Sequence, residues 1–233
     1  MMKFNLLDVE CSNKELLSKA FTHPSYTKEK DLPSTDNYER LEFLGDAVLK
    51  LVTSNLLYSK YPDYDEGELS KIRSILVSDV TLSKIANEIN LNKRLVLGSG
   101  EEKTGGRERE SNNACSMEAV LGVYYLDNKM KDIEKFLEEH LLPYADDIEN
   151  HFERYNAKAV LQEYTQGITT ELPEYNVIKM SGPAHKPIFE VEVVFKGEVL
   201  ATGKGKTKKD AQQEAALSAC KKLGIIEREE NEA

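Results

Sequence analysis

The sequence predicts a two-domain protein, in which an all-α part is followed by a small α+β domain with the order α-β-β-β-α. Its 233 residues exceed the usual length of one domain. Through the first 153 residues, apolar side chains recur every three or four positions, as they do on helices. From residue 154 onward, helical segments are mixed with alternating ones. We expect the domains to span 1–152 and 156–225, with a charged tail at 226–233.

Helical periodicity marks six segments of the first domain. They are 14–22, 37–59, 68–77, 79–90, 114–127 and 131–150. Clusters of glycine, proline and aspartate predict loops at 28–36, 61–67 and 98–107. The first domain is therefore expected to consist of helices and their connections.

The second domain begins with a predicted helix at 156–167, which ends at Gly167. Alternating apolar residues then favour three strands, at 174–181, 188–197 and 198–205. The last predicted helix is 207–223, where Thr207 and Asp210 can form a capping box. This order predicts three strands flanked by two helices.

Cysteine usage and hydropathy point to a protein of the cytoplasm. The three cysteines are scattered and lack CxxC spacing, which argues against structural disulfides and against a zinc site. No apolar run is long enough to predict a signal peptide or a transmembrane helix. We therefore expect no membrane association and no organic cofactor.

The charge is distributed unevenly along the chain. Residues 154–233 carry 12 lysines and arginines against 12 acids, so the formal charge of −10 belongs to residues 1–153. Five lysines fall within residues 196–209, "KGEVLATGKGKTKK". This local basic patch predicts an anionic partner for the second domain, such as nucleic acid.

Three acids stand among apolar residues in "NYERLEFLGDAVLKL", residues 37–51. On a helix, Glu39, Glu42 and Asp46 point from one face, and Glu118 lies on a second apolar helix. Carboxylates on a rigid frame suit a divalent cation with hard oxygen preferences. The alternative is a solvated face in which Asp46 pairs with Arg40 or Lys50. Spacing alone leaves both interpretations open.

Several segments together resemble the ribonuclease III family, the endonucleases of double-stranded RNA. The segments are "AFTHPSY" (20–26), "ERLEFLGDAVL" (39–49), "EGELSKIRSILVS" (66–78), "LGSGEEKTGGR" (97–107) and "MEAVLGVYYLD" (117–127). The second domain is similar to a double-stranded RNA-binding domain. The resemblance implies a homodimer that cuts duplex RNA, leaves 5′-phosphate and 3′-hydroxyl ends, and processes ribosomal precursors and other RNAs.

Carried over residue by residue, the resemblance assigns the acids. It makes Glu42, Asp46 and Glu118 ligands of a catalytic Mg²⁺, a role that Mn²⁺ could also fill. Glu39 matches an acid that assists nearby, so the implied catalytic residues are Glu39, Asp46 and Glu118. Phe43 matches a position that packs into the partner subunit; its alternative is a core phenylalanine of the same monomer.

The resemblance also implies RNA contacts. They are Gln162, Glu163, Gln166, His185, Lys206, Lys208 and Lys209 in the second domain, with Glu66 and Arg73 in the first. Lys208 and Lys209 lie in a first helical turn, where the macrodipole disfavours cations, so phosphate explains them better than stability does. Alternatives are a generic lysine cluster, an incidental loop histidine at 185, and an Arg73–Glu68 pair. His23 is expected to bond a turn before Pro24.

One position departs from the family pattern. An Asp usually stands three residues before the last glutamate, where this chain has Cys115 in "ACSMEA". A thiol is a soft ligand that suits Mg²⁺ poorly and is mostly protonated at neutral pH. Three ligands of four remain, and we expect activity; the alternative is a duplex-RNA-binding protein with an impaired or inactive nuclease site. Asn112 and Asn113 also replace residues that are commonly apolar.

Overall fold

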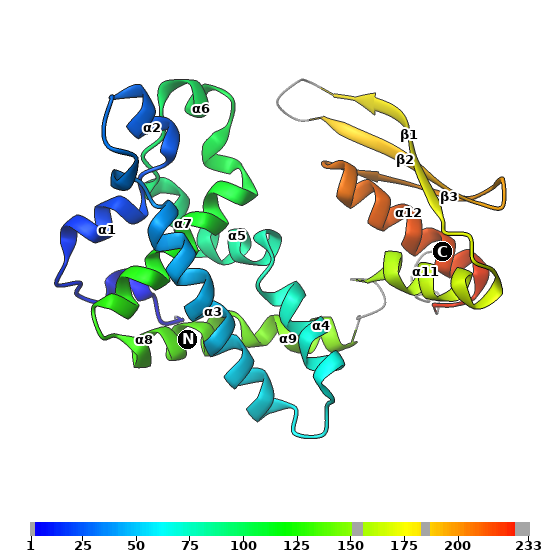
Figure 1. The fold of residues 1–233 in the computed structure, drawn as a ribbon, viewed down its shortest axis with the longest axis horizontal. Coiled ribbons are helices and arrows are strands. Elements are labelled where there is room, and N and C mark those ends of the chain that lie inside the picture. The colour runs from blue at the N-terminus through cyan, green and yellow to red at the C-terminus, as the bar shows by residue number, and fades with distance from the viewer. Residues whose placement is uncertain (1–2, 151–155, 183–186, 227–233) are drawn as a thin grey trace. The chain divides into compact units, whose positions relative to one another are not determined.

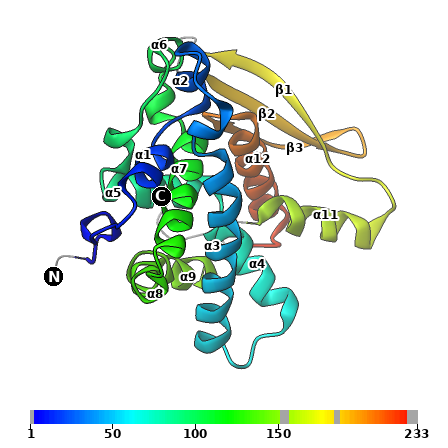
Figure 2. The same ribbon diagram turned by 60° about the vertical axis from the view of Figure 1, so that its left-hand side comes forward.

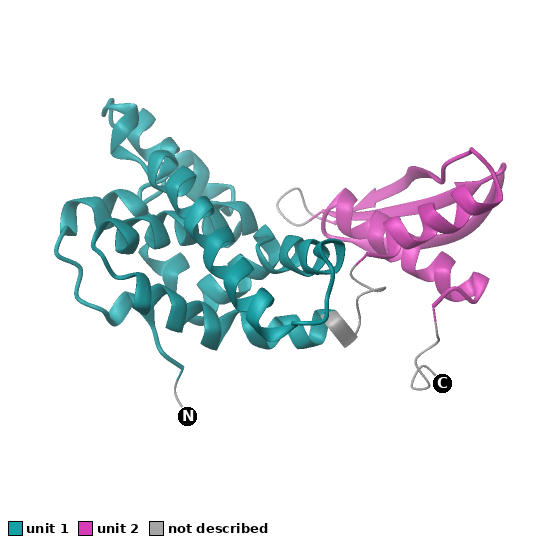
Figure 3. Ribbon diagram, turned by 60° about the horizontal axis from the view of Figure 1, so that its bottom comes forward, with its two compact units in different colours: residues 1–149 teal, residues 150–233 magenta. Residues whose placement is uncertain are grey.

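The computed structural model describes residues 3–150, 156–182 and 187–226. The chain forms two compact units, residues 1–149 and 150–233, coloured separately in Figure 3. The boundary expected after residue 152 falls in 151–155, and the tail falls mainly in 227–233, both outside the described residues. Among the described helices, none has both the length and the apolar composition required to span a bilayer.

The first unit is helical, as expected. Its α-helices are α1 (Lys14–Ala20), α2 (Pro24–Glu29), α3 (Glu39–Lys60), α4 (Glu66–Leu76), α5 (Asp79–Glu88), α6 (Ser99–Lys103), α7 (Glu110–Leu126), α8 (Met130–His140) and α9 (Leu142–Asn150). Short 3₁₀ turns are η1 (Leu6–Asp8), η2 (Ser34–Asp36), η3 (Leu91–Arg94) and η4 (Gly106–Glu108). These helices and 3₁₀ turns make up the first unit and carry the acidic residues of interest.

Helix α7 lies at the centre of this unit, with α3 and α5 packed against it (Figures 1 and 2). Most of its residues are buried, including Leu121 and Tyr124, neither of which exposes any surface. A helix surrounded by protein has no polar face to keep in water, so its composition is apolar on nearly all sides. Any acid on α7 is therefore held in a largely apolar environment.

Two glycines allow α3 and α7 to approach closely. A Cβ built on Gly45 of α3 would lie 1.7 Å from the backbone oxygen of Glu118, and one on Gly122 would lie 2.5 Å from the backbone oxygen of Leu41. Larger side chains at these positions would push the helix axes apart. Close approach at this crossing brings the acidic turns of α3 next to Glu118.

The boundaries differ from expectation at three places. The segment 131–150 is two helices, because Pro143 lacks the N–H that would continue α8 through its last turn. The segment 98–107, expected as a loop, contains α6 and part of η4. Helix α2 was not predicted; His23 caps it, since its Nδ1 accepts a 2.9 Å bond from the backbone N–H of Ser25, which confirms the expected turn before Pro24.

The second unit has the predicted α-β-β-β-α order. Its elements are α11 (Ala157–Ile168), β1 (Glu174–Ser181), β2 (Ile188–Phe195), β3 (Glu198–Gly205) and α12 (Lys208–Leu223). The strands form an antiparallel sheet in the order β1-β2-β3, with Tyr175 opposite Val193 and Val193 opposite Ala201. Leu161, Val193 and Ala215 contribute one buried side chain each from α11, β2 and α12 to a common core.

Helix α12 lies directly on β3. A Cβ on Gly203 would be 2.1 Å from the backbone nitrogen of Ala215, and one on Gly205 would be 2.4 Å from that of Ala211. The glycines of "GKGK" and the alanines of α12 thus let backbone meet backbone. This contact holds the start of α12, with its lysines, beside the end of β3.

Candidate functional site

The three acids of α3 have different surroundings. The Glu39 carboxylate accepts a 3.1 Å bond from Nδ2 of the buried Asn37. Glu42 is half-buried, and its pKa is raised by burial and by the nearby acids Glu39, Asp79 and Asp46. Asp46 forms a 2.7 Å ion pair with Lys50 one turn later. Local pairing of Asp46 and electrostatic crowding of Glu42 therefore occur on the same helix.

Glu118 faces these acids from α7. Burial, followed by the charges of Asp46, Glu42 and Asp79, raises its pKa to about 8. Burial and nearby like charges both disfavour the ionised carboxylate, so they act in the same direction here. At neutral pH, and with no cation added, this carboxyl group holds its proton.

Cys115 lies on α7, three residues before Glu118, and its thiol is near Glu42 and Tyr38. Burial, followed by the Glu42 charge, raises the pKa of Cys115 to about 12, so the thiol stays protonated at neutral pH. Cys115 therefore adds no negative charge to the group of acids.

Asp79 is an acid that the sequence interpretation missed. It opens α5 directly after Ser78, whose side chain caps the helix, and its charge raises the pKa values of Glu42, Cys115 and Glu118. An acid in a first turn is ordinarily explained by the helix dipole. For that reason nothing in the sequence pattern distinguishes Asp79 from a capping residue.

The side chains of these acids are of the type that binds a cation, but they do not converge on one point. Among the residues that the structure describes, no three His, Cys, Asp or Glu side chains converge as a ready cation site. The donors that lie nearest one another are carboxylates, which suit Mg²⁺, and their raised pKa values reflect a repulsion that a cation relieves. Asp46 is paired with Lys50, as the solvated-face alternative stated. It would have to break this ion pair to become a cation ligand.

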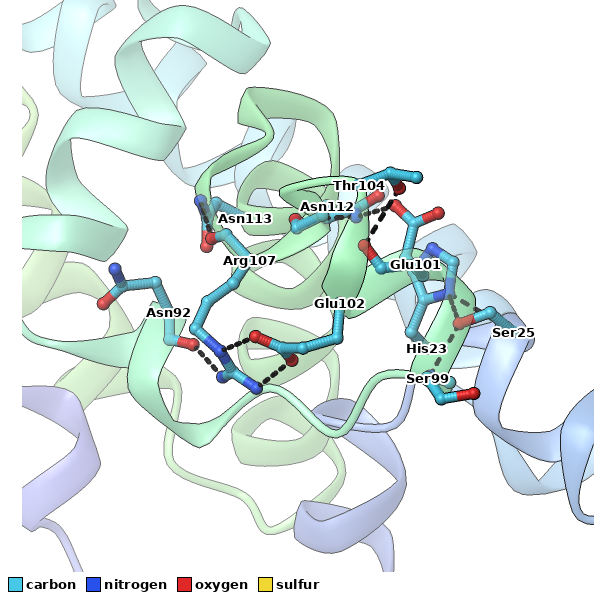
Figure 4. Close-up of polar contacts among 12 residues, drawn as sticks. His23, Ser25, Asn92, Ser99, Glu101, Glu102, Thr104, Arg107, Asn112 and Asn113 are labelled. Atoms are coloured by element: carbon cyan, nitrogen blue, oxygen red, sulfur yellow. Dashed lines mark hydrogen bonds and ion pairs between the residues drawn. The ribbon is translucent and has the colours of Figure 1, made fainter. Parts of the chain in front are cut away.

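Asn112 and Asn113 fix the segment before α7. Nδ2 of Asn112 donates to Oε1 of Glu101 over 2.8 Å and to the carbonyl of Gly106 over 2.9 Å, and Nδ2 of Asn113 donates to the carbonyl of Arg107 over 3.1 Å (Figure 4). Polar groups in a buried place need such partners. The two unusual asparagines therefore tie α6 and η4 to the start of α7.

A charged bridge extends this network to η3. Arg107 makes bonds of 3.0 and 2.6 Å to the two oxygens of Glu102 and donates over 2.7 Å to the carbonyl of Asn92 (Figure 4). Paired bonds between guanidinium and carboxylate are geometrically specific. The segment 98–109 is consequently an ordered part of the unit.

The lysines expected to contact phosphate surround the start of α12. Lys206, Lys208 and Lys209 are all exposed. The predicted capping box is confirmed, because Thr207 and Asp210 exchange two bonds of 3.1 Å. The capping box therefore fixes the start of α12, and the three exposed lysines lie in or just before its first turn.

Gln162, Glu163 and Gln166 are exposed on α11. Gln162 and Gln166 are four residues apart and share a helix face. His185 lies outside the described residues. The second unit therefore presents a polar row on α11 and a basic end on α12.

On α4, Glu66 accepts a 2.8 Å bond from Ser70, and Arg73 donates to Ser54 of α3 over 2.7 Å. Glu68 is instead engaged by Asp65 in a capping box, so the predicted Arg73–Glu68 alternative is wrong. Both Glu66 and Arg73 line a groove of about 590 Å³ between α3 and α4.

Phe43 is a surface residue of its unit, with 83% of its area exposed. The alternative of a core phenylalanine is therefore wrong. Leu51 and Tyr58, at 61% and 74% exposure, continue an apolar stripe along the same helix. Such a stripe on a helix face indicates an interaction surface.

Comparison with known proteins agrees with both units. Residues 13–145 match the Ribonuclease-III-like family, and residues 157–223 match the double-stranded RNA binding motif. The chain belongs to the ribonuclease III family of endoribonucleases. Ribonuclease 3 of Streptococcus mutans is 45% identical over 213 residues, which cover 91% of each chain. Ribonuclease 3 of Staphylococcus aureus strain Mu3 is 42% identical over 224 residues, 96% of this chain and 92% of that one.

Among solved structures, the nuclease domain of ribonuclease III from Campylobacter jejuni resembles the first unit. The match has a TM-score of 0.51 and 36% identity, and covers 57% of this chain and 92% of that one. That structure is described as flexible in a region involved in dimer formation. The ribonuclease III resemblance read from the sequence, and the fold class it implied, are confirmed.

Proposed function

We propose that this ribonuclease III family member hydrolyses both strands of duplex RNA as a metal-dependent homodimer, leaving 5′-phosphate and 3′-hydroxyl ends. The observation that carries the proposal is the close crossing of α3 and α7, where burial and the charges of Asp46 and Glu42 raise the pKa of Glu118. Perturbed carboxyl groups of this kind cluster at catalytic sites. Ribosomal precursors and other duplex-forming transcripts of the cytoplasm are the substrates we propose.

In this proposal Glu42, Asp46 and Glu118 hold Mg²⁺, or Mn²⁺ in its place. The bound ion would supply a water of lowered pKa and offset charge on the phosphate oxygens. Binding of the cation would favour the deprotonated form of Glu118, whose pKa is about 8 without it. Asp46 would have to exchange its ion pair with Lys50 for the cation.

Glu39 has the second catalytic role. Asn37 holds one of its oxygens, while the residue as a whole is exposed at the first turn of α3. An oriented, accessible carboxylate can accept a hydrogen bond from a water or from a substrate ribose. Glu39 thus positions a reacting partner beside the cation ligands.

The second unit supplies duplex recognition in this proposal. Lys206, Lys208 and Lys209 contact phosphates at the start of α12. The α11 row of Gln162, Glu163 and Gln166, together with His185, contacts ribose hydroxyls in the minor grooves. Such contacts identify A-form shape, so binding should be specific for duplex RNA over single strands.

The nuclease unit adds its own contacts. Glu66 and Arg73, which line one groove, contact the substrate from α4, and the stripe of Phe43, Leu51 and Tyr58 packs against a second copy of the chain. Exposed apolar residues of this size are costly in water and are stabilised when a partner covers them.

The test is cleavage of a uniform RNA duplex by the purified full chain with Mg²⁺, Mn²⁺ or EDTA. We expect cleavage with either metal, none with EDTA, and products that a ligase accepts through their 5′-phosphates. Glu118→Gln should abolish cleavage while Glu110→Gln, an exposed acid in the first turn of the same helix, should not. Equal cleavage by wild type and Glu118→Gln would refute the site.

A second candidate is a duplex-RNA-binding protein with an impaired nuclease site. It is favoured by the protonated Cys115 thiol, which stands where the family pattern has a fourth acid and adds no charged oxygen to the site. Binding of duplex that persists in EDTA, without cleavage at any concentration of either metal, would select this candidate.

A further inference from the structure

One lysine of the second unit is held between its two helices. Nζ of Lys158, on α11, donates a 2.7 Å hydrogen bond to Oε1 of Gln212 on α12. The same ammonium group lies 4.6 Å from the ring centroid of Tyr175 on β1. Lys158 therefore connects its own helix, α11, to both α12 and β1.

Lys158 differs from the lysines at the start of α12. It is half-buried, whereas Lys208 and Lys209 are exposed. Burial, and then the charge of Lys209, lowers the pKa of Lys158, which shows that the two ammonium groups lie near each other. The ammonium group of Lys158 is already bound by the Gln212 amide and lies against the Tyr175 ring, so it is less available to a phosphate than the exposed lysines are.

A weaker polar contact also joins these helices. The Cys220 thiol lies 3.7 Å from the carbonyl of Ala157, and small side chains such as Ala216 contribute apolar packing to the same core. Apolar packing of small residues permits a helix to slide more readily than a directional hydrogen bond does. Lys158–Gln212 is thus a short directional link between α11 and α12.

We propose that Lys158 is a positioning residue for duplex binding, which ties α11 to α12 through Gln212 and so sets the spacing between the α11 polar row and the α12 lysines. The assignment rests on the proposed function of these two surfaces. Grooves of A-form RNA have a fixed separation, so two contact surfaces must be held at a matching distance. Holding them before binding removes an ordering cost from association.

The test compares full-length Lys158→Met with wild type in binding to an RNA duplex of about 16 base pairs, the length one such domain spans, over a range of salt. Methionine keeps an unbranched stem over Tyr175 but cannot donate to Gln212. We expect about tenfold weaker binding, with an unchanged slope of affinity against salt, since no phosphate contact is lost. Lys158→Arg, which keeps a donor and a cation, should bind as wild type.

Lys222→Met is the matched control. Lys222, on α12, also donates one hydrogen bond, over 2.9 Å to the backbone carbonyl of Leu200, but it lies 13 residues beyond Lys209. It should leave binding unchanged. A duplex of about half the length, too short to span both surfaces, should bind Lys158→Met and wild type equally, which a general folding defect would not produce.

Gln212→Leu removes the acceptor and provides a second route. It should weaken binding as Lys158→Met does, and the double variant should be no weaker than either single one. A salt slope reduced by about one unit in Lys158→Met would overturn the assignment, because Lys158 would then contact phosphate directly. Unchanged binding in both single variants would overturn it as well. A wild-type chain that binds no duplex would refute the proposed function and, with it, this assignment.

Discussion

Gly45 of α3 lies against the backbone carbonyl of Glu118 of α7, so closely that a single added carbon at position 45 would overlap it. Glycine stands before Asp46 because the backbone of α7 leaves no room for a side chain at this position. The same contact packs the helices and sets the separation of the acids.

Gly45→Ala should destabilise the nuclease unit by about 3 kcal/mol or more, because backbone atoms of both helices must move to admit the methyl group. Urea unfolding of the full chain, followed by the loss of helical signal, measures the change. Gly100→Ala is the control, since a Cβ there meets nothing within 4 Å. Equal stability of the two variants would contradict the crossing.

Cys115→Asp should raise the affinity for Mg²⁺ by about tenfold, because affinity for hard cations rises with the number of charged oxygen ligands. Calorimetric titration of the RNA-free protein with Mg²⁺ gives the constant directly. Cys115→Ser, which adds a neutral hydroxyl, should stay near wild type. If Asp and Ser behave alike, a fourth carboxylate has no role in this chain.

Glu118→Gln should stabilise the protein in EDTA above neutral pH and have little effect in acid. The folded pKa of Glu118 is about 8, above the ordinary value of 4.5. Between these pH values the folded chain keeps a proton that the unfolded chain loses, so wild-type stability falls as pH rises through this window. Melting temperatures of both proteins across the window, with Glu110→Gln beside them, test this. A difference between wild type and Glu118→Gln that does not vary with pH would contradict the raised pKa.

Lys208→Ala and Lys209→Ala should each weaken duplex binding and lower its salt slope by about one unit, as expected when one phosphate contact is lost. Filter binding or anisotropy at several salt concentrations provides the slope. Lys222→Ala, near the other end of α12, should leave it intact. A slope that stays at the wild-type value in the Lys208 and Lys209 variants would remove them from the interface.

Phe43→Ala should weaken self-association by removing the most exposed large apolar side chain of α3. Sedimentation velocity over a range of protein concentration gives the monomer–dimer equilibrium. Leu32→Ala, at an exposed apolar residue with 45% of its area accessible, is the comparison. An equilibrium altered equally by both changes would argue against the α3 stripe as the contact.

The helices and strands were largely predictable because periodicity and capping are local properties. Thr207 and Asp210 lie three residues apart, so their capping box can be read from the sequence and is confirmed. Pro143 is a signal for a helix break, but the apolar spacing of 131–150 favoured one continuous helix. The Gly45–Glu118 contact could not be predicted, since it joins residues distant in the chain.

The candidate site was also predictable only in its local features, and not in the contacts between residues distant in the chain. Glu42 and Asp46 share a helix, and their spacing alone suggested a common face. The Asp46–Lys50 pair was one of two alternatives that spacing left open. Asp79 reaches the cluster only through tertiary packing of α5 on α7, and no periodicity reports such a contact.

The asparagines near the start of α7 determine which segments of this nuclease unit could be exchanged with those of a relative. Asn112 bonds Glu101 and Gly106, and Asn113 bonds Arg107, so each amide is matched to the segment 98–109. A chimaera that imports α7 alone, with apolar residues at both positions, would remove one hydrogen-bond donor each from the Glu101 carboxylate and from the carbonyls of Gly106 and Arg107. Residues 98–113 should therefore be exchanged together. The hydrogen bonds that fix the start of α7 are then kept, and with them the position of Cys115 and Glu118 on this helix.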